Sequence, residues 1–469
     1  GLNAKREEEE KAKLAAYKAT LTTEEIEDIV AKAKHLEEYQ SEPSTPEELE
    51  SIPLLEIEDI EKKARTLNNS FSEIEMVKVV SHDIFTNGIS YINLNFDITD
   101  IDCDKYPVVS LLSEIFKYVD TENYSYNELA NEINIHTGGI GFTTAVTNCK
   151  ENGKYVVQFV VNTKQLDDKI DKAMSLVEEI LFTSKLSDKK RLREIIAETR
   201  SGLKMDLVSS GHITAAGRAM SYVSPMGVVK ELLEGVEYYK YLAELDDNFD
   251  DKYEQLVEDL NDVLGQVLRR NALTVNYTSD KKPEDMLKES VTSLSKKLST
   301  RLEFENPKRP ELLVLNEGFK TSSQVQYVAT AGNFRDKGLE YNSALSVLQT
   351  IFSYDYLWLN VRVKGGAYGC MCAFARSGNG YFTSYRDPNL METYDIYKEA
   401  AEYVRSFDAD DRDMTKYIIG AISKLDAPLT PSAEGNYSYV AYLMGLTDED
   451  LQRDRDEILN ANVEKIRKL

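Results

Sequence analysis

The sequence contains one order of predicted elements twice, and this internal repeat constrains the fold more than any other feature. In each copy a strand, at 89–96 or at 324–329, is followed by a helix and then by a Gly-Gly pair, Gly138-Gly139 or Gly365-Gly366. Another strand and long helices follow each pair. Strands with alternating apolar residues and helices that come in runs predict an α+β fold, in which one sheet is covered by helices.

The repeat extends into the helical part of each copy. A small-residue loop, 210–212 in the first copy and 432–435 in the second, follows the long helices and precedes more helix. We therefore predict two homologous α/β sandwich domains, residues 66–305 and 306–469, joined by a linker that contains proline.

Residues 1–65 differ from both copies because they are dominated by Ala, Glu and Lys. They predict a helical-hairpin linker with one helix over 5–20 and a second that a Thr22–Glu25 capping box opens. Pro43 ends this second helix, and Thr45 caps a short third one. A coiled-coil arm for a partner is the alternative, and the short apolar seam disfavours it.

Arg362 and Tyr368 stand on either side of the second Gly-Gly pair. A long cationic donor and a phenolic donor across a chain reversal can point into one cleft and hold a peptide carbonyl or an oxyanion. Ile135 and Gly141 occupy the aligned positions of the first copy, so the copies share the turn but not the polar pair. The alternative is a surface arginine and a half-buried strand tyrosine.

The four cysteines, Cys103, Cys149, Cys370 and Cys372, are too few for a disulfide framework. Cys370 and Cys372 lie two residues apart on a predicted strand, which puts both on one face. Small core residues are the favoured interpretation, and a metal or redox pair is the alternative.

The formal charge of −25 excludes nucleic acids and anionic membrane surfaces as favoured partners, because both would be repelled. No apolar run reaches the roughly 18 residues of a membrane span. The charge is compatible with basic peptides as ligands, and acidic helix surfaces that serve solubility are the alternative explanation.

Five short motifs occur in a fixed order along the chain: 85–89 (Phe-Thr-Asn-Gly-Ile), 135–139 (Ile-His-Thr-Gly-Gly), Gly211-His212 with 218–222 (Arg-Ala-Met-Ser-Tyr), 362–368 (Arg to Tyr) and 384–389 (Ser-Tyr-Arg-Asp-Pro-Asn). Together they resemble the C-terminal half of a presequence-protease-type zinc metallopeptidase, in the family of pitrilysin and insulin-degrading enzyme. The resemblance covers essentially all 469 residues.

This resemblance implies a peptidase of four homologous domains whose two halves close around an unstructured oligopeptide, basic peptides included. The N-terminal half of the same polypeptide would hold zinc through a His-x-x-Glu-His motif and a distal Glu. Arg362 and Tyr368 would be the catalytic contribution of this chain, and with Gly365 and Gly366 they would bind the substrate backbone. The cytoplasm of a bacterium is the expected location, and an organelle matrix is the alternative.

The histidines predict that this chain itself holds no zinc. His35 stands nearest to such a motif, in His-Leu-Glu-Glu-Tyr, but Tyr39 replaces the second histidine. We interpret His35 as a solvated helix residue. We expect His82, His136 and His212 to cap or pack, with His136 in a turn and His82 as a second candidate for a turn. The chain alone is therefore expected to be inactive.

The ends of the chain predict a piece of a longer protein, because it begins without Met and ends in a helix where the family continues to a further strand. The last domain is expected to be truncated. Two alternatives stay open: a catalytically inactive pitrilysin-like scaffold, and the non-metal subunit of a two-chain peptidase. The Arg362–Tyr368 pair argues against the first, and the linker helices argue against the second.

Overall fold

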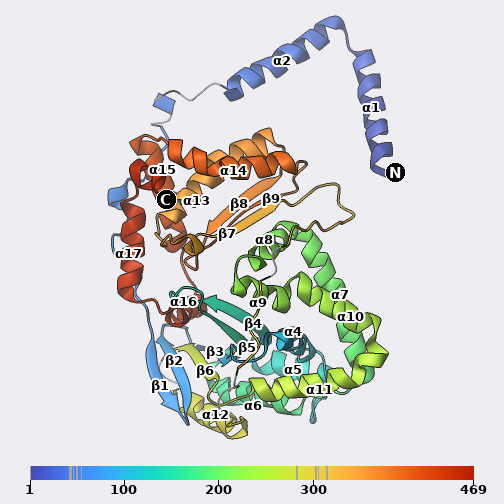
Figure 1. The fold of residues 1–469 in the computed structure, drawn as a ribbon, viewed down its shortest axis with the longest axis vertical. Helices are drawn as coiled ribbons and strands as arrows, with labels where there is room; N and C mark the ends of the chain where they lie inside the picture. Colours follow the sequence, from blue (N-terminus) through green and yellow to red (C-terminus); the bar gives the residue numbers. More distant parts are fainter. Residues whose placement is uncertain are drawn as a thin grey trace. The chain divides into compact units, whose positions relative to one another are not determined.

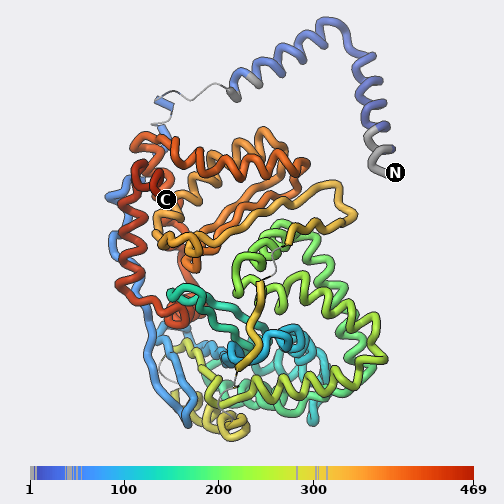
Figure 2. Tube along the Cα trace, viewed as in Figure 1, coloured from blue at the N-terminus to red at the C-terminus, as the bar shows by residue number. Residues whose placement is uncertain are grey.

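A computed structural model describes residues 2–41, 45, 47–48, 51–53, 55–280, 284–300, 304, 306–312 and 315–469 (Figures 1 and 2). The chain divides into two compact units, Gly1–Asp59 and Ile60–Leu469. Mixed helix and sheet, with sheets packed against helices, confirms the predicted α+β class. The division at residues 65 and 305 stays a prediction.

The first unit contains helices α1 (Leu2–Thr20) and α2 (Thr23–Ser41). The predicted capping box is present: the Thr22 amide donates to Glu25 Oε2 at 2.8 Å, and the Glu25 amide donates to Thr22 Oγ1 at 3.2 Å. Nearly all of the described side chains of these two helices are exposed. Pro43 lies outside the described residues.

A six-stranded sheet organises the first copy. Its strands are β1 (Ser70–Ile74), β2 (Val77–Asp83), β3 (Ile89–Asp97), β4 (Ile140–Asn148), β5 (Tyr155–Leu166) and β6 (Leu273–Ser279), in the order β1-β2-β6-β3-β5-β4. The β2–β6 pair is parallel and the other pairs are antiparallel. Ile92, Leu94 and Phe96 of β3 alternate into an apolar core, as the period of two predicts.

The helices of the first copy include α4 (Tyr106–Ile115), α5 (Tyr126–His136), α6 (Ile170–Thr183), α7 (Lys189–Ser209), α8 (Gly211–Ser221), α9 (Pro225–Glu234), α10 (Val236–Asp247), α11 (Phe249–Val267) and α12 (Glu284–Lys297). Residues of α4, α6, α11 and α12 share the apolar core with the sheet. Figure 1 shows α6 and α12 on one side of this sheet.

The second copy has a three-stranded sheet in the described residues, β7 (Ala329–Asn333), β8 (Gly369–Phe374) and β9 (Asn379–Tyr385), in the order β7-β9-β8. This order matches β3-β5-β4 of the first copy, as two copies of one arrangement require. Its helices are α13 (Leu345–Ile351), α14 (Met391–Ser406), α15 (Asp411–Leu425), α16 (Pro431–Met444), α17 (Asp448–Leu459) and α18 (Val463–Arg467). The strand predicted at 324–329 begins later than expected: of that range only Ala329 belongs to β7, and Gln326 forms an isolated bridge to Asp387.

The two copies exchange one helix each. Helix α8 of the first copy packs on β7 and β9, and α16 of the second copy packs on β2, β4 and β6 (Figure 1). The loops predicted at 210–212 and 432–435 are therefore wrong, since these residues lie at the start of the exchanged helices. The small residues at these helix starts do not form a turn. They allow the helices to pack closely against a sheet.

The sheet face under α16 is polar, and residues of α16 form hydrogen bonds with it and with the segment before β1. The Asn68 amide donates to Ser438 Oγ at 3.1 Å, and Gln158 Nε2 donates to the Tyr439 hydroxyl at 3.0 Å. His82 lies on β2 with 1% of its surface exposed, bonded to Asn276 Oδ1 at 2.8 Å. His82 therefore packs, as expected, and does not lie in a turn.

The turn assignment of His136 is wrong as well. His136 is the last residue of α5, and its Nε2 lies 3.7 Å from Glu132 Oε2, one turn earlier on the same helix. The helix continues to the residue before Thr137, so the turn begins one position later than the sequence predicts.

The close approach of α16 predicts that Gly435→Ala destabilises the second unit. A Cβ at Gly435 would fall well inside van der Waals contact of Thr278 Oγ1 and lie 3.1 Å from His82 Cδ2, on a stiff β-branched neighbour. We expect the free energy of unfolding to fall by about 1–3 kcal/mol in urea titration.

The matched control is Gly202→Ala on α7, where a Cβ meets no atom within 4 Å. Alanine there should leave stability unchanged or raise it slightly, because alanine favours the helix. Equal stability of the two variants would contradict the close packing of α16.

Candidate functional site

The second Gly-Gly pair ends a helix, as predicted. Arg362 lies in the π-helical segment Trp358–Lys364, and the Gly366 amide donates to the Arg362 carbonyl oxygen at 2.9 Å. Gly366 has φ +81°, the left-handed conformation that closes a helix and that glycine adopts without strain. The chain then enters β8 directly after Tyr368.

The turn brings Arg362 and Tyr368 together. The Arg362 guanidinium carbon lies 5.6 Å from the Tyr368 ring centroid and 4.1 Å from that of Trp358. Tyr368 is 66% exposed, so its ring and hydroxyl are open to a ligand. Stacking between two rings holds the cation in place and leaves its N–H groups as donors.

Three aromatic side chains form a chain of ring contacts next to this pair: Tyr385 of β9, His212 of α8 and Tyr327, which precedes β7. The Tyr385 ring lies edge-on to Tyr368 at 5.8 Å and to His212 at 4.8 Å, and Tyr327 lies 5.7 Å from Tyr385. His212 and Tyr385 belong to motifs 211–212 and 384–389, so the motifs pointed to them. Nothing in the sequence indicated Trp358 or Tyr327 as neighbours of the pair.

The motif 384–389 fixes the backbone of the Gly-Gly turn. Asp387 is fully buried. Its carboxylate accepts hydrogen bonds from the Thr393 hydroxyl at 2.8 Å and from the backbone amide of Asn389 at 2.9 Å. Asn389 Nδ2 in turn donates to the Gly365 carbonyl oxygen at 2.6 Å. This chain of bonds sets the position from which Arg362 and Tyr368 project.

The cysteines of β8 lie beside this site, where Cys372 is buried and Cys370 is half-buried. Burial raises the pKa of Cys370 to about 11 and that of Cys372 to about 12. Both thiols are therefore protonated near pH 7 and are poor nucleophiles.

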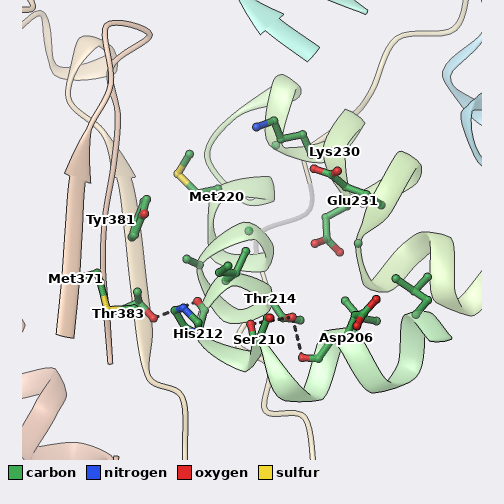
Figure 3. Close-up of a pocket in the computed structure, with 18 of the residues that line it drawn as sticks. Asp206, Ser210, His212, Thr214, Met220, Lys230, Glu231, Met371, Tyr381 and Thr383 are labelled. Atoms are coloured by element: carbon green, nitrogen blue, oxygen red, sulfur yellow. Dashed lines mark hydrogen bonds between the residues drawn. The ribbon is translucent and has the colours of Figure 1, made fainter. Parts of the chain in front are cut away.

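A cavity of about 680 Å³ opens next to His212, between the face of β8 and β9 and helices α7, α8 and α9 (Figure 3). Met371, Tyr381 and Thr383 form its strand wall. Its helical wall includes Leu203, Asp206, Leu207, His212, Gly217, Met220, Met226, Lys230, Glu231 and Glu234. Thr383 Oγ1 donates to the His212 carbonyl oxygen at 3.2 Å and joins the two walls.

A buried ion cluster holds the helical wall and the segment before β7. Arg218 donates to Glu317 at 2.7 Å, to Glu237 at 2.7 Å and to Glu231 at 3.1 Å. Burial raises the pKa of Glu231, and the Arg218 charge opposes that rise. Arg218 is itself buried and is shared by three carboxylates, so its loss would leave Glu231 and Glu317 without their counter-charge.

The residues present do not fit a zinc site. Among the residues that the structure describes, no three His, Cys, Asp or Glu side chains come together to hold a metal ion. His35 and Tyr39 are exposed on α2, as predicted for His35, and His82, His136 and His212 lie on different elements. In the described part of the chain, every helix is also too short or too polar to pass through a lipid bilayer.

Two protein family models match this sequence. Residues 1–245 match the domain described as associated with subfamily C of the M16 peptidases, and residues 316–469 match the "PreP C-terminal domain". The chain therefore belongs to subfamily C of the M16 peptidase family, and it corresponds to the C-terminal half of a presequence-protease-type member, as the motifs predicted.

Curated relatives show the same correspondence. Protein HypA of Clostridium perfringens is 38% identical over 100% of this chain and 48% of its own length. Presequence protease 1 of Arabidopsis thaliana, chloroplastic/mitochondrial, is 32% identical over 97% of this chain and 42% of its own. The chain thus spans about half the length of the curated relatives it matches.

Solved structures share the fold. A conserved protein from Enterococcus faecalis superposes with a TM-score of 0.60 at 15% identity, covering 86% of this chain and 95% of that one. A peptidase M16 inactive domain from Pseudomonas fluorescens superposes with a TM-score of 0.56 at 14% identity, covering 86% and 94%. At this identity the likeness concerns the fold alone.

The scattered histidines predict that the purified chain binds no stoichiometric zinc. Stable binding takes three or four ligands in one place, so metal analysis after dialysis should give far less than about one zinc per chain. His35→Ala should leave this value unchanged. About one tightly held zinc per chain would overturn our assignment of the chain to the half without the metal.

Proposed function

We propose that this chain is the substrate-binding half of a zinc-dependent peptidase that degrades unstructured oligopeptides in a closed chamber. Membership of the M16 peptidase family supports the reaction class. The observation that carries the proposal is the Arg362–Tyr368 pair, joined across the Gly-Gly turn and open to a ligand. Zinc would belong to the N-terminal half of the same polypeptide, and the bacterial cytoplasm is its proposed location.

Arg362 and Tyr368 would bind the peptide backbone next to the bond that is cut. The guanidinium and the phenol both donate hydrogen bonds, and a carbonyl oxygen gains negative charge as the peptide bond is attacked. Arg362 lies over the Trp358 ring and Tyr368 packs edge-on against Tyr385, and these contacts orient both donors before the peptide arrives. Little reorganisation is then required during the reaction, which is how preorganised donors lower a barrier.

The peptide bound by this half is proposed to be basic. The chain carries 81 acidic and 56 basic residues, which gives the formal charge of −25. An acidic wall would attract cationic peptides over a distance and would repel acidic ones.

The first functional prediction concerns Tyr368→Phe in the intact enzyme. The change removes one hydroxyl and keeps the ring that packs against Tyr385. We expect kcat/KM to fall by about 100-fold, the loss typical of one oxyanion donor, with unchanged zinc content and Tm.

Tyr354→Phe is the matched control, because Tyr354 is an equally exposed tyrosine of the preceding helical segment. Its kcat/KM should stay within about twofold of the parent value. Full activity of Tyr368→Phe would favour the alternative of an inactive scaffold for this half.

The second functional prediction concerns salt. If the acidic surface attracts the peptide, the Kd of an unstructured cationic peptide should rise roughly threefold to tenfold between about 0.02 and 0.15 M NaCl. An acidic peptide of equal length should bind more weakly at low salt and lose less affinity. Fluorescence anisotropy measures both, and equal affinities at low salt would refute the attraction.

A further inference from the structure

The cavity beside His212 lies along the same sheet face as the Arg362–Tyr368 pair. The Tyr368 amide donates to the Tyr385 carbonyl oxygen at 3.0 Å, so Tyr368 sits at the end of β9. Tyr385, Thr383 and Tyr381 alternate along this strand on one face, and the last two form the cavity wall. Two residues of a strand span roughly 7 Å. In an extended peptide bound along β9, the side chain that enters the cavity would therefore lie about two residues from the residue held by the Arg362–Tyr368 pair.

The cavity can bury an apolar stem. Met220, Met226 and Met371 line it from three different elements, together with Leu203 and Leu207 of α7. Figure 3 shows Met220 and Tyr381 on opposite walls. Methionine side chains adapt to ligands of different shape, and a volume of about 680 Å³ lies within the range of ligand pockets.

The polar groups of the cavity favour a cation at the end of that stem. Asp206 and Glu234 are exposed at the lining and form no ion pair with other described residues, and Lys230 is the one lysine or arginine among the lining residues. Glu231 is occupied by Arg218. The available carboxylates therefore outnumber the cation two to one.

His212 lines the same cavity and does not oppose a cation in it. Its Nδ1 atom is buried and has no hydrogen-bond partner among the described residues. Burial lowers the pKa of His212, so the ring is neutral near pH 7 and does not repel a cation.

We propose that this cavity is a specificity pocket that takes the arginine or lysine side chain of a peptide held by Arg362 and Tyr368, an inference that rests on the function proposed above. The methylene stem would lie on the methionines and leucines. The cationic head would meet Asp206 and Glu234, as amphipathic side chains do when their stems are buried and their charges are not.

The binding test uses three fluorescein-labelled unstructured nonapeptides that differ only in the central residue: arginine, norleucine or glutamate. Anisotropy with the full chain at low salt should give the order arginine, norleucine, glutamate, with at least about tenfold between the first and the last, because the pocket selects both stem and charge. Norleucine binding as tightly as arginine would overturn the charge selection and with it the proposal.

Gly217→Leu fills the cavity from α8. A Cβ at Gly217 meets only Glu231 Oε1, at 3.9 Å, so the leucine fits the backbone and takes the space of the ligand. The preference for arginine over glutamate should fall below about twofold. Gly265→Leu is the matched control, since Gly265 is a helical glycine with open space that does not line the cavity. An unchanged preference in Gly217→Leu would refute the pocket.

The double variant Asp206→Asn, Glu234→Gln separates charge from volume. It should bring arginine down to the affinity of norleucine and leave norleucine binding unchanged. Arginine that still binds more tightly than norleucine would show that these carboxylates do not select the cation, and would overturn that assignment.

Turnover by the intact enzyme separates this proposal from the one on which it rests. Tyr368→Phe should slow cleavage of all three peptides equally, whereas Gly217→Leu should slow only the arginine peptide. Suppose that Gly217→Leu abolishes the arginine preference but Tyr368→Phe leaves turnover unchanged. This result would support the specificity pocket and contradict the proposed role of the Arg362–Tyr368 pair. If Gly217→Leu slows cleavage of all three peptides equally, the proposed specificity pocket is contradicted.

Discussion

The exchange of one helix between the two copies is the packing interaction on which the second unit depends. Each sheet has an apolar face covered by helices of its own copy and a second face covered by a helix of the other copy, α16 on the first sheet and α8 on the second. Gly211 and Gly435 permit this approach, because a Cβ at Gly211 would overlap Tyr327, which precedes β7, and one at Gly435 would overlap Thr278 of β6. Neither copy can complete both faces of its sheet without the other.

The same exchange builds the candidate site. Helix α8 carries His212 to Tyr385, and thereby places the cavity alongside the strand that leads to Tyr368. The first copy keeps the turn, but Ile135 there is 69% exposed and the space beside Gly141 is taken by the Asn162 side chain. One turn therefore carries donors in one copy and serves only the fold in the other, which is how a duplicated domain can divide its roles.

The sequence predicted the strands and helices whose pattern is local. The period of two identified β3, and the Thr22–Glu25 capping box marked the start of α2, because alternation and capping depend on neighbouring residues. It misplaced the strand before β8 because pairing, rather than pattern, sets where β7 begins: Arg386 has φ +50°, so the ladder with β9 stops and Gln326 keeps one bridge. The sequence also did not predict the π-helical segment that contains Arg362.

The sequence by itself determined the duplication, the α+β class, the family resemblance and the two residues of the polar pair, since each is written in the order and chemistry of residues along the chain. Only the tertiary structure decided that Trp358 and Tyr385 contact the Arg362–Tyr368 pair and that His82 is buried beneath α16. It also decided that a cavity lies between α8 and β9. These contacts join segments as far apart as His82 and Gly435. No local pattern encodes them, because each depends on how the two sheets exchange helices.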